Sequence, residues 1–423
     1  MNRFFYSALL YLVLPFVPFK LWWRGIKQPA YRQFWQERFG FYPKKSVKSV
    51  IWLHCVSVGE TRAAEPLIRA LLKQYPNHQI LLSHTTPTGR ETSEQLFADS
   101  VMRVYLPYDL PFAVSRFLKH FQPKIGLLME TELWFNLIAA CKKREIPLLL
   151  LNARLSEKSA NGYSKLGHLV SNGLQSLDAV AAQTVDDAAR LQKLGATNVT
   201  VSGNLKFDVK PPADAVENGL QLRHLFNAGN DRIIFLAAST REGEEALILE
   251  AIKDLYLQKV NFLTVIVPRH PQRFDEVEAL IKRAGFYYQR RSELTTPVNS
   301  AVEIILGDSM GELFSYYAAC DFTFVGGSLL NFGGQNLIEA ATMGKPILIG
   351  KHTYNFAEAS KNALSAGAAL QVSNAKELRD SIQHLLSNQQ MREKMQYASL
   401  SFSQASTGAT AKVMELIANH LKL

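Results

Sequence analysis

The stretch VIWLHCVSVGETRAAEPLIRALLKQ, residues 50–74, decides the fold of this chain. Residues 50–55 are apolar apart from His54, which is typical of a strand buried on both faces of a parallel sheet. A loop of small residues follows, and residues 62–74 then place apolar side chains at helical spacing. A buried strand, a small-residue loop and a helix form the repeating unit of a doubly wound α/β domain.

The same alternation recurs along most of the chain. Apolar runs predict a first series of strands at residues 50–55, 80–84, 104–106, 125–129, 148–151, 179–182 and 199–201, and a second series at residues 233–237, 263–267, 304–306, 322–325 and 347–349. Helical patterns, such as those of residues 62–74 and 242–256, separate the strands. Two series of this kind predict two Rossmann-like domains with parallel sheets.

The length of 423 residues also favours two domains over a single core. The sequence Lys-Pro-Pro at 210–212 continues neither a helix nor a central strand, so it predicts the break between them. We expect a membrane anchor at residues 1–23, an N-terminal domain at 24–208, a linker at 209–230, a C-terminal domain at 231–390 and C-terminal helices at 391–423.

The net charge of +10 is concentrated at the N-terminus, where the first 48 residues hold nine Lys or Arg residues against the single acid Glu37. Such local basicity predicts contact with an anionic surface rather than general binding of nucleic acid. The three cysteines, Cys55, Cys141 and Cys320, are odd in number and form no Cys-x-x-Cys pair. Cysteine usage of this kind favours a reducing compartment.

Residues 4–19 are apolar except for Ser7 and the tyrosine hydroxyls, and residues 21–23 extend the run beyond Lys20. A spanning helix needs about 20 apolar residues, and two prolines weaken the second half of this one. The segment therefore either crosses a membrane or dips into it, and a buried helix of a soluble domain is the remaining alternative. In both membrane cases the basic flank predicts that the body of the protein is cytoplasmic.

Three predicted strands lead into loops of the same character. Each loop brings small residues to a helix start, where N–H groups suit an anion: Ser57-Val58-Gly59-Glu60, Ser239-Thr240-Arg241-Glu242 and Gly326-Gly327-Ser328. Helix capping explains such loops equally well, since the acids at 60, 242 and 339 each complete a capping box. Capping does not explain the glycines between 326 and 334, which usually mark a close approach of the backbone.

Charged residues also follow predicted strands, at the end where open α/β sheets bind ligands. Arg269 follows a strand of the second series and is either an anion-binding residue or a surface arginine. Glu130 and Glu132 follow a strand of the first series. One of them is expected to be structural, paired with Arg154 or Lys206, and Glu132 is the stronger candidate for that role.

Several nucleotide-binding signatures are absent from the sequence. No Gly-x-x-x-x-Gly-Lys-[Ser/Thr] loop is present, which argues against an NTPase, and no Gly-x-Gly-x-x-Gly follows the first strand, which argues against a dinucleotide oxidoreductase. No Asp-x-Asp pair is present to hold a divalent ion against a diphosphate. We therefore expect no metal and no other cofactor.

Taken in order, the motifs of this chain resemble those of the Kdo transferases, which transfer 3-deoxy-D-manno-octulosonic acid. The matching stretches are HxxSxGE at 54–60, PTG at 87–89, YLPYD at 105–109, METELW at 129–134, NARLS at 152–156, GNLKFD at 203–208, PRHP at 268–271, VGGS at 325–328 and GQNLIEA at 334–340. The basic, hydrophobic N-terminus is similar too. Phe135 departs from an expected proline and Gln335 from a common histidine, and neither is a residue that we assign to catalysis.

The resemblance implies a GT-B glycosyltransferase architecture, with two Rossmann-like domains facing a cleft and C-terminal helices that cross back to the N-terminal domain. It implies inverting transfer of Kdo from CMP-Kdo to a hydroxyl of a lipid A precursor, lipid IVA, in lipopolysaccharide biosynthesis. The N-terminal domain would receive the lipid and the C-terminal domain the nucleotide. The enzyme would lie on the cytoplasmic face of the inner membrane of a Gram-negative bacterium.

The resemblance also assigns roles to residues. Glu60 is the expected general base, and its place at a helix N-terminus is expected to keep it ionised and to lower its basicity. Donor binding is assigned to Lys206, Ser239, Thr240, Arg269, Gly326, Gly327, Ser328, Asn336 and Glu339, with N–H groups of the glycine loop meeting the phosphate. Acceptor-binding or structural roles are expected for Ser57, Gly59, Glu130, Glu132, Arg24, Lys27, Arg32 and Arg38. The four basic residues are explained equally well as topology determinants.

Two rival classes of protein fit parts of the pattern. A nucleotide-sugar epimerase of the same fold would need no membrane segment. A non-catalytic lipid-binding adaptor would need no glycine-rich nucleotide loop.

Overall fold

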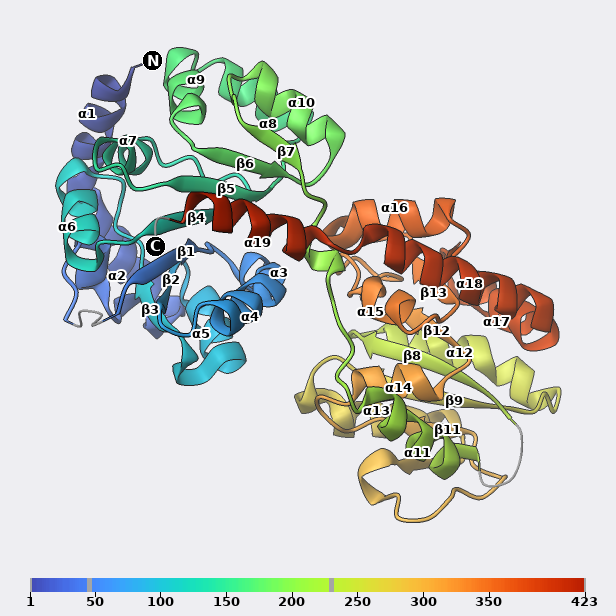
Figure 1. The fold of residues 1–423 in the computed structure, drawn as a ribbon. Helices are drawn as coiled ribbons and strands as arrows, with labels where there is room; N and C mark the ends of the chain where they lie inside the picture. Colours follow the sequence, from blue (N-terminus) through green and yellow to red (C-terminus); the bar gives the residue numbers. More distant parts are fainter. Residues whose placement is uncertain (1, 44–47, 228–231, 422–423) are drawn as a thin grey trace. The chain divides into compact units, whose positions relative to one another are not determined.

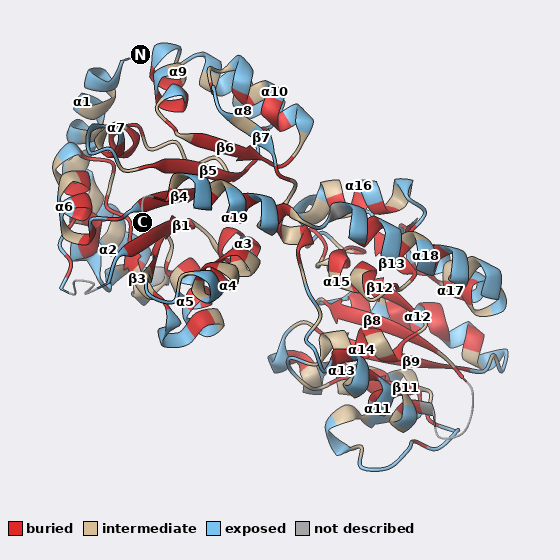
Figure 2. Cartoon of the chain, viewed as in Figure 1, coloured by how far each residue is buried: buried red, intermediate tan, exposed pale blue. Residues whose placement is uncertain are grey.

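The computed structural model describes residues 2–43, 48–227 and 232–421. Contacts divide the chain into two compact units: unit 1 is Met1–Asp208 with Ser406–Leu423, and unit 2 is Val209–Ala405. Each unit holds one parallel sheet with helices on both faces (Figure 1). Figure 2 shows that the central strands of both sheets are buried, whereas the outer faces of many helices are exposed.

Among the described residues, the sheet of unit 1 has seven strands in the order β3-β2-β1-β4-β5-β6-β7. The strands are β1 Val50–His54, β2 Gln79–His84, β3 Met102–Tyr105, β4 Ile125–Met129, β5 Leu148–Ala153, β6 Ala179–Ala182 and β7 Val199–Val201. All neighbouring strands are parallel. The strand order reverses between β1 and β4, and ligands bind at such switch points in open α/β sheets.

Helices cover both faces of this sheet because its strands carry apolar side chains on both faces. Trp52 packs on one face with Phe117 and Leu174, and Leu53 packs on the other with Ile68 and Ile417. The helices are α3 Val58–Ala63, α4 Glu65–Gln74, α5 Pro87–Phe97, η4 Ala98–Ser100, α6 Pro111–Phe121, α7 Phe135–Lys143, α8 Glu157–Ser164, α9 His168–Gln175, α10 Val185–Lys193, η5 Leu205–Phe207 and α19 Ala409–His420.

The described part of unit 2 repeats this plan, with seven parallel strands in the order β10-β11-β9-β8-β12-β13-β14. The strands are β8 Ile233–Thr240, β9 Phe262–Pro268, β10 Tyr288–Arg290, β11 Ile304–Leu306, β12 Phe322–Val325, β13 Ile347–Gly350 and β14 Ala369–Val372. The helices are α11 Ala215–Asn227, α12 Glu244–Leu257, η6 Pro271–Arg273, α13 Phe274–Ala284, η7 Arg291–Glu293, α14 Leu313–Ala319, α15 Leu337–Thr342, η8 Tyr354–Phe356, α16 Ala357–Ser365, α17 Ala375–Ser387 and α18 Gln389–Ser406. The switch point of this sheet lies between β8 and β12.

The N-terminal segment is helical and lies on unit 1. It consists of α1 Arg3–Val13, η1 Leu14–Phe16 and α2 Val17–Lys27, and the short helices η2 Pro29–Arg32 and η3 Trp35–Phe39 follow. By length and apolar composition, Arg3–Ile26 is the one candidate membrane span among the described residues. Its large apolar side chains are exposed, with Phe4 at 75% and Phe16 at 69%. The alternative of a buried helix of a soluble domain is therefore wrong.

The predicted fold class is confirmed, and every predicted strand is present in the structure. Two strands were not predicted, β10 and β14. Both lie at edges of their sheet, and both include polar or exposed residues such as Gln289 and Gln371. A short edge strand is not buried on both faces, so it lacks the continuous apolar run on which the prediction relied.

The segments that join the units differ from the expectation. Residues 209–230, expected to be a linker, contain α11, whose Leu222 and Phe226 are buried in unit 2. Of the two C-terminal helices, α18 stays with unit 2, and α19 packs on unit 1 through Val413 and Ile417. Apolar faces on α11 and α18 explain why both helices pack within unit 2 instead of crossing between units.

Candidate active site

Glu60 lies in the first turn of α3, directly after β1, at the switch point of the unit 1 sheet. Ser57 caps this helix, because its Oγ accepts the amide proton of Glu60 at 3.4 Å. The Glu60 carboxylate turns back and accepts the amide proton of Val56 at 2.7 Å and the hydroxyl proton of Ser57 at 3.0 Å. The predicted capping box is therefore present. A Cβ on Gly59 would meet only Ser57, at 3.8 Å, so no crowding requires glycine there.

The electrostatics of Glu60 differ from the expectation. Burial, helped by the nearby carboxylates of Glu130 and Glu132, raises the pKa of Glu60 to about 7, against the hydrogen bonds from Val56 and Ser57, which lower it. The helix N-terminus was expected to lower the basicity of Glu60, but the net pKa is raised, because burial outweighs the hydrogen bonds at the helix start that lower it. Its side chain is only 7% exposed, so the loss of solvation outweighs the helix dipole.

Glu130 and Glu132 follow β4, on the other side of the same switch point. Glu130 adopts a left-handed backbone with φ of 58°, a conformation that is uncommon for non-glycine residues. Its carboxylate lies 3.8 Å from the ammonium nitrogen of Lys206. The sequence favoured Glu132 for this pairing, and the structure gives it to Glu130. Burial raises the pKa of Glu132, and the charge of Glu130 adds to that effect.

Two histidines, His54 and His84, end β1 and β2 and are fully buried. Burial lowers the pKa of His54 to about 4 and that of His84 to about 3. Both imidazoles are therefore neutral and weakly basic at pH 7. The pKa of Glu60, about 7, matches a general base working near neutral pH.

The four basic residues of the N-terminal region occupy different surroundings. Arg24 and Arg32 are exposed and lie over the rings of Tyr31 and Trp22. The side chain of Lys27 is not among those that the structure describes. Arg38 is only 3% exposed, because it stacks 4.1 Å from the centre of the Tyr105 ring and donates to a backbone oxygen at 3.0 Å. The contacts that the structure gives Arg38 are thus within unit 1, as expected for a structural role.

In unit 2 the residues predicted for the donor gather at the carboxyl ends of β8, β9 and β12. Ser239 has a left-handed backbone with φ of 55°, so both switch points carry a strained non-glycine residue. Thr240 is completely buried and donates to Glu245 at 2.7 Å. Glu245 also accepts two hydrogen bonds from the guanidinium of Arg273, at 2.6 and 3.1 Å. Thr240 therefore belongs to the framework beneath the site.

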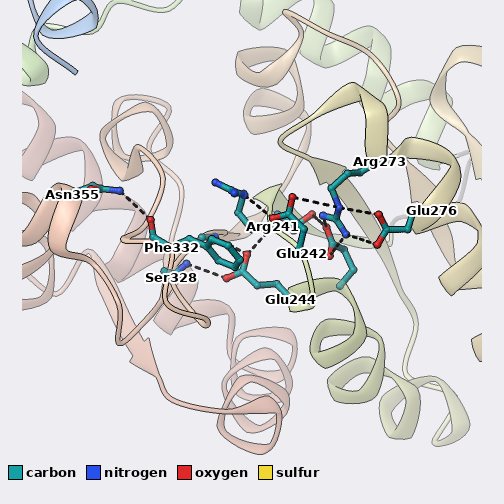
Figure 3. Close-up of polar contacts among 11 residues, drawn as sticks. Arg241, Glu242, Glu244, Arg273, Glu276, Ser328, Phe332 and Asn355 are labelled. Carbon is teal, nitrogen blue, oxygen red and sulfur yellow. Dashed lines mark hydrogen bonds and ion pairs between the residues drawn. The ribbon is translucent and has the colours of Figure 1, made fainter. Parts of the chain in front are cut away.

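The glycine loop does not present its N–H groups to a ligand. Figure 3 shows the carboxylate of Glu244 reaching this loop, where it accepts the amide protons of Gly327 at 2.6 Å, Ser328 at 3.0 Å and Leu329 at 2.9 Å. The amide of Arg241 donates to the same carboxylate at 2.9 Å. The capping acid of α12 is thus Glu244, and Glu242, which the sequence favoured, is half exposed. The expectation that residues 326–328 offer free N–H groups is corrected, because an internal carboxylate already satisfies them.

Crowding within unit 2 also explains the glycines. A Cβ on Gly326 would lie 2.5 Å from the backbone oxygen of Ser239, and one on Gly333 would lie 2.4 Å from the side chains of Tyr354 and Asn355. The amide of Asn355 also donates to the Gly333 oxygen at 2.9 Å. These glycines predicted that the backbone approaches another group closely. In the structure that group is another loop of the same chain.

Two cationic residues, Arg241 and Arg269, lie at the carboxyl ends of β8 and β9. The Arg269 amide donates to the Thr240 oxygen at 3.0 Å, which places Arg269 beside the loop after β8. Burial, together with the neighbouring charges of Arg241 and Arg269, lowers the pKa of His270. Arg241 stacks on Phe332 at 4.4 Å and pairs with Glu242 (Figure 3). Arg241 was not predicted as a site residue, although it lies in the same predicted loop as Ser239.

The last two predicted donor residues cap α15. Asn336 accepts the amide proton of Ile338 at 3.1 Å, and its side-chain amide donates to Glu339 at 3.0 Å. Burial raises the pKa of Tyr317 well above its usual value, and the charges of Glu339 and Arg269 act on it in opposite directions. The structure thus brings Arg269, Asn336 and Glu339 to one edge of the unit 2 sheet. It places Lys206 in unit 1, beside Glu130.

The fold and these two edges define a two-domain α/β glycosyltransferase of the GT-B type. Solved structures share this fold, including a glycosyltransferase from Rickettsia africae ESF-5, with a TM-score of 0.55 and 15% identity over 89% of this chain and 100% of that chain. A UDP-GlcNAc 2-epimerase from Neisseria meningitidis has a TM-score of 0.55 and 18% identity, over 89% of this chain and 100% of that chain. Likeness at this identity concerns the fold alone.

Residues 33–209 match the family described as 3-Deoxy-D-manno-octulosonic-acid transferase (kdotransferase), and residues 223–401 match Glycosyl transferases group 1. The 3-deoxy-D-manno-octulosonic acid transferase of Bordetella pertussis is 39% identical over 433 residues, which cover all of both chains. That of Haemophilus influenzae is 38% identical over 427 residues, which cover 100% of this chain and 99% of the relative. The chain belongs to the 3-deoxy-D-manno-octulosonic acid transferase family. It is an enzyme of that class, and both rival interpretations, the epimerase and the adaptor, are wrong.

Proposed function

We propose that this Kdo transferase moves Kdo from CMP-Kdo to a hydroxyl of a lipid A precursor, lipid IVA, by a single inverting displacement. In that step the acceptor oxygen bonds to the anomeric carbon of Kdo and the bond from that carbon to the CMP phosphate breaks. The acceptor hydroxyl gives its proton to the carboxylate of Glu60, and CMP leaves with the bonding electron pair. Each atom and charge is then accounted for without a cofactor.

The observation that carries the proposal is the pKa of Glu60, raised to about 7 by burial at the switch point of unit 1. A general base works best when its pKa lies near the working pH, because it is then both substantially ionised and basic. The hydrogen bonds from Val56 and Ser57 fix the carboxylate in one orientation. Positioning of that kind is needed for proton transfer within hydrogen-bond distance.

Donor binding in unit 2 rests on the edge that holds Arg269, Asn336 and Glu339. A guanidinium beside a strand end suits the phosphate of CMP or the carboxylate of Kdo. The amide and carboxylate of the α15 cap suit ribose hydroxyls, since they offer both donors and acceptors. Arg241 joins this set because it lies on the same edge and is held over Phe332.

We also propose that the N-terminal segment meets the cytoplasmic face of a bacterial inner membrane. Exposed apolar side chains on α1 and α2, including Leu12 at 71% and Trp23 at 61%, form a surface of the kind that lipid covers. Arg24 and Arg32 are exposed near the end of α2, where lipid phosphates would meet them.

The test of the base is Glu60→Gln, with Glu157→Gln as the matched control on an exposed helix turn of the same unit. Glutamine can still accept the Val56 amide proton, so folding and CMP-Kdo affinity should be retained. Turnover, measured as lipid-dependent release of CMP, should fall by about 10²–10⁴-fold, and the control should be unaffected. Near-normal turnover of Glu60→Gln would mean that Glu60 only caps α3.

A further inference from the structure

Two polar side chains of the largely apolar helix α1 face the body of unit 1. The Tyr6 hydroxyl donates to Oδ2 of Asp109 at 2.9 Å. The Ser7 hydroxyl lies 3.0 Å from Oδ1 of Asn136 and also 3.0 Å from the Arg3 backbone oxygen of its own helix, so its single proton is shared between the two acceptors. The Tyr6 ring also meets the ring of Phe135 edge-on, with centroids 5.3 Å apart. These contacts fasten the first two turns of the N-terminal helix to unit 1.

Asp109 links this helix to α7. It is 2% exposed, and its carboxylate accepts the amide protons of Asn136 at 2.9 Å and Leu137 at 2.8 Å. Its backbone oxygen accepts a proton from the Asn136 side chain at 2.7 Å. Amide groups in the first turn of a helix have no partner within the helix, so Asp109 satisfies the start of α7 from outside. We call the four residues Tyr6, Ser7, Asp109 and Asn136 the α1 latch.

The α1 latch holds one end of the loop that carries two of the acids around Glu60. This loop, residues 130–134, joins β4 to α7. Its first residue, Glu130, is tied to the sheet by its amide, which donates to the Leu151 oxygen at 2.9 Å. Its other end runs into the turn of α7 that Asp109 caps. A loop that starts with a strained residue keeps its shape only if both ends are fixed.

We propose that the N-terminal helix is a positioning element for this loop as well as a membrane contact, and that Tyr6 and Asp109 are positioning residues for transfer. The inference rests on the proposed role of the Glu60 edge in the reaction. A helix that only contacts lipid needs apolar side chains. It does not need the hydroxyls of Tyr6 and Ser7 to contact Asp109 and Asn136, which lie at the buried start of α7. With α1 seated, the loop is ordered for turnover; with α1 displaced, the loop relaxes.

The test uses the full-length protein with Tyr6→Phe and Ser7→Ala combined, which keeps the aromatic contact with Phe135. Tyr11→Phe is the matched control, because Tyr11 lies on the same helix, contacts Phe112 through its ring and makes no hydrogen bond with other described residues. Three quantities are measured: binding to vesicles of phosphatidylglycerol and phosphatidylethanolamine, affinity for CMP-Kdo, and turnover with lipid A precursor.

The double variant should bind vesicles and CMP-Kdo as the wild type does, while kcat falls about fivefold to tenfold, the effect of losing one or two hydrogen bonds. Amide hydrogen exchange should accelerate in residues 130–137 and stay unchanged in α10. The control should match the wild type throughout. Wild-type turnover of the double variant, or a fall that merely parallels loss of vesicle binding, would overturn the inference.

The result for the double variant can be distinguished from the result for Glu60→Gln. If Glu60→Gln is inactive and the double variant is fully active, the proposed function stands and the latch is only structural. If Glu60→Gln is active and the double variant is slow with normal vesicle binding, the base is misassigned and the positioning role of α1 stands.

Discussion

The carboxylate of Glu244 accepts the amide proton of Gly327 at 2.6 Å, across the switch point of the unit 2 sheet. Glu244 is fully buried, and it also binds the amides of Arg241, Ser328 and Leu329. One internal carboxylate therefore organises the two loops, after β8 and β12, that carry the proposed donor site.

We expect Glu244→Gln to destabilise the protein by about 3 kcal/mol, because hydrogen bonds to a charged acceptor are lost and an amide group now faces buried N–H donors. Denaturant unfolding of the full chain, followed by circular dichroism, measures this loss. Glu242→Gln is the control, since its half-exposed ion pairs contribute little. Equal effects of the two substitutions would contradict a structural role for Glu244.

Glu130→Gln should shift the acid limb of the pH–rate profile to lower pH. The negative charge of Glu130 disfavours ionised Glu60 and so raises the pKa of Glu60; neutralising it lowers that pKa and leaves more active base at acidic pH. The wild-type limb in kcat/KM should have its midpoint near pH 7. Glu91→Gln, an exposed change in the same unit, should leave the profile in place. An unmoved limb in Glu130→Gln would show that another group controls it.

Arg269→Lys should impair use of the donor by about 1.5–3 kcal/mol, the contribution of one charge-assisted contact. Lysine keeps the charge but cannot make two parallel hydrogen bonds. Steady-state kinetics with each substrate varied separately should show a higher KM for CMP-Kdo, a lower kcat, or both, with the acceptor KM unchanged. Arg283→Lys, at an exposed position of α13, serves as the control. A raised acceptor KM with normal donor parameters would remove Arg269 from the donor site.

Deletion of residues 1–23 should release the protein from membranes, because the exposed apolar side chains of α1 and most of α2 are removed. Affinity for CMP-Kdo should be retained, since the proposed donor residues belong to unit 2. Fractionation of cell membranes and calorimetry with CMP-Kdo check the two parts. Unchanged membrane association would show that a different surface makes the contact.

The sequence by itself determined the two parallel sheets, because strands buried on both faces appear as continuous apolar runs separated by helical patterns. It also placed Glu60 and Arg269 after strands, where open α/β sheets bind ligands, and Ser57-x-x-Glu60 fixed a local cap that the structure confirms. Local signals of this kind depend on residues close together in the chain.

Only the tertiary structure decided which partners these residues meet. Glu244 satisfies the glycine loop from more than 80 residues away, Lys206 pairs with Glu130 instead of Glu132, and Arg38 is buried against Tyr105. The pKa of Glu60 likewise reverses its expected direction, because burial depends on chain segments that pack over it. Burial and long-range pairing come from folding the whole unit, and no spacing along the sequence encodes them directly.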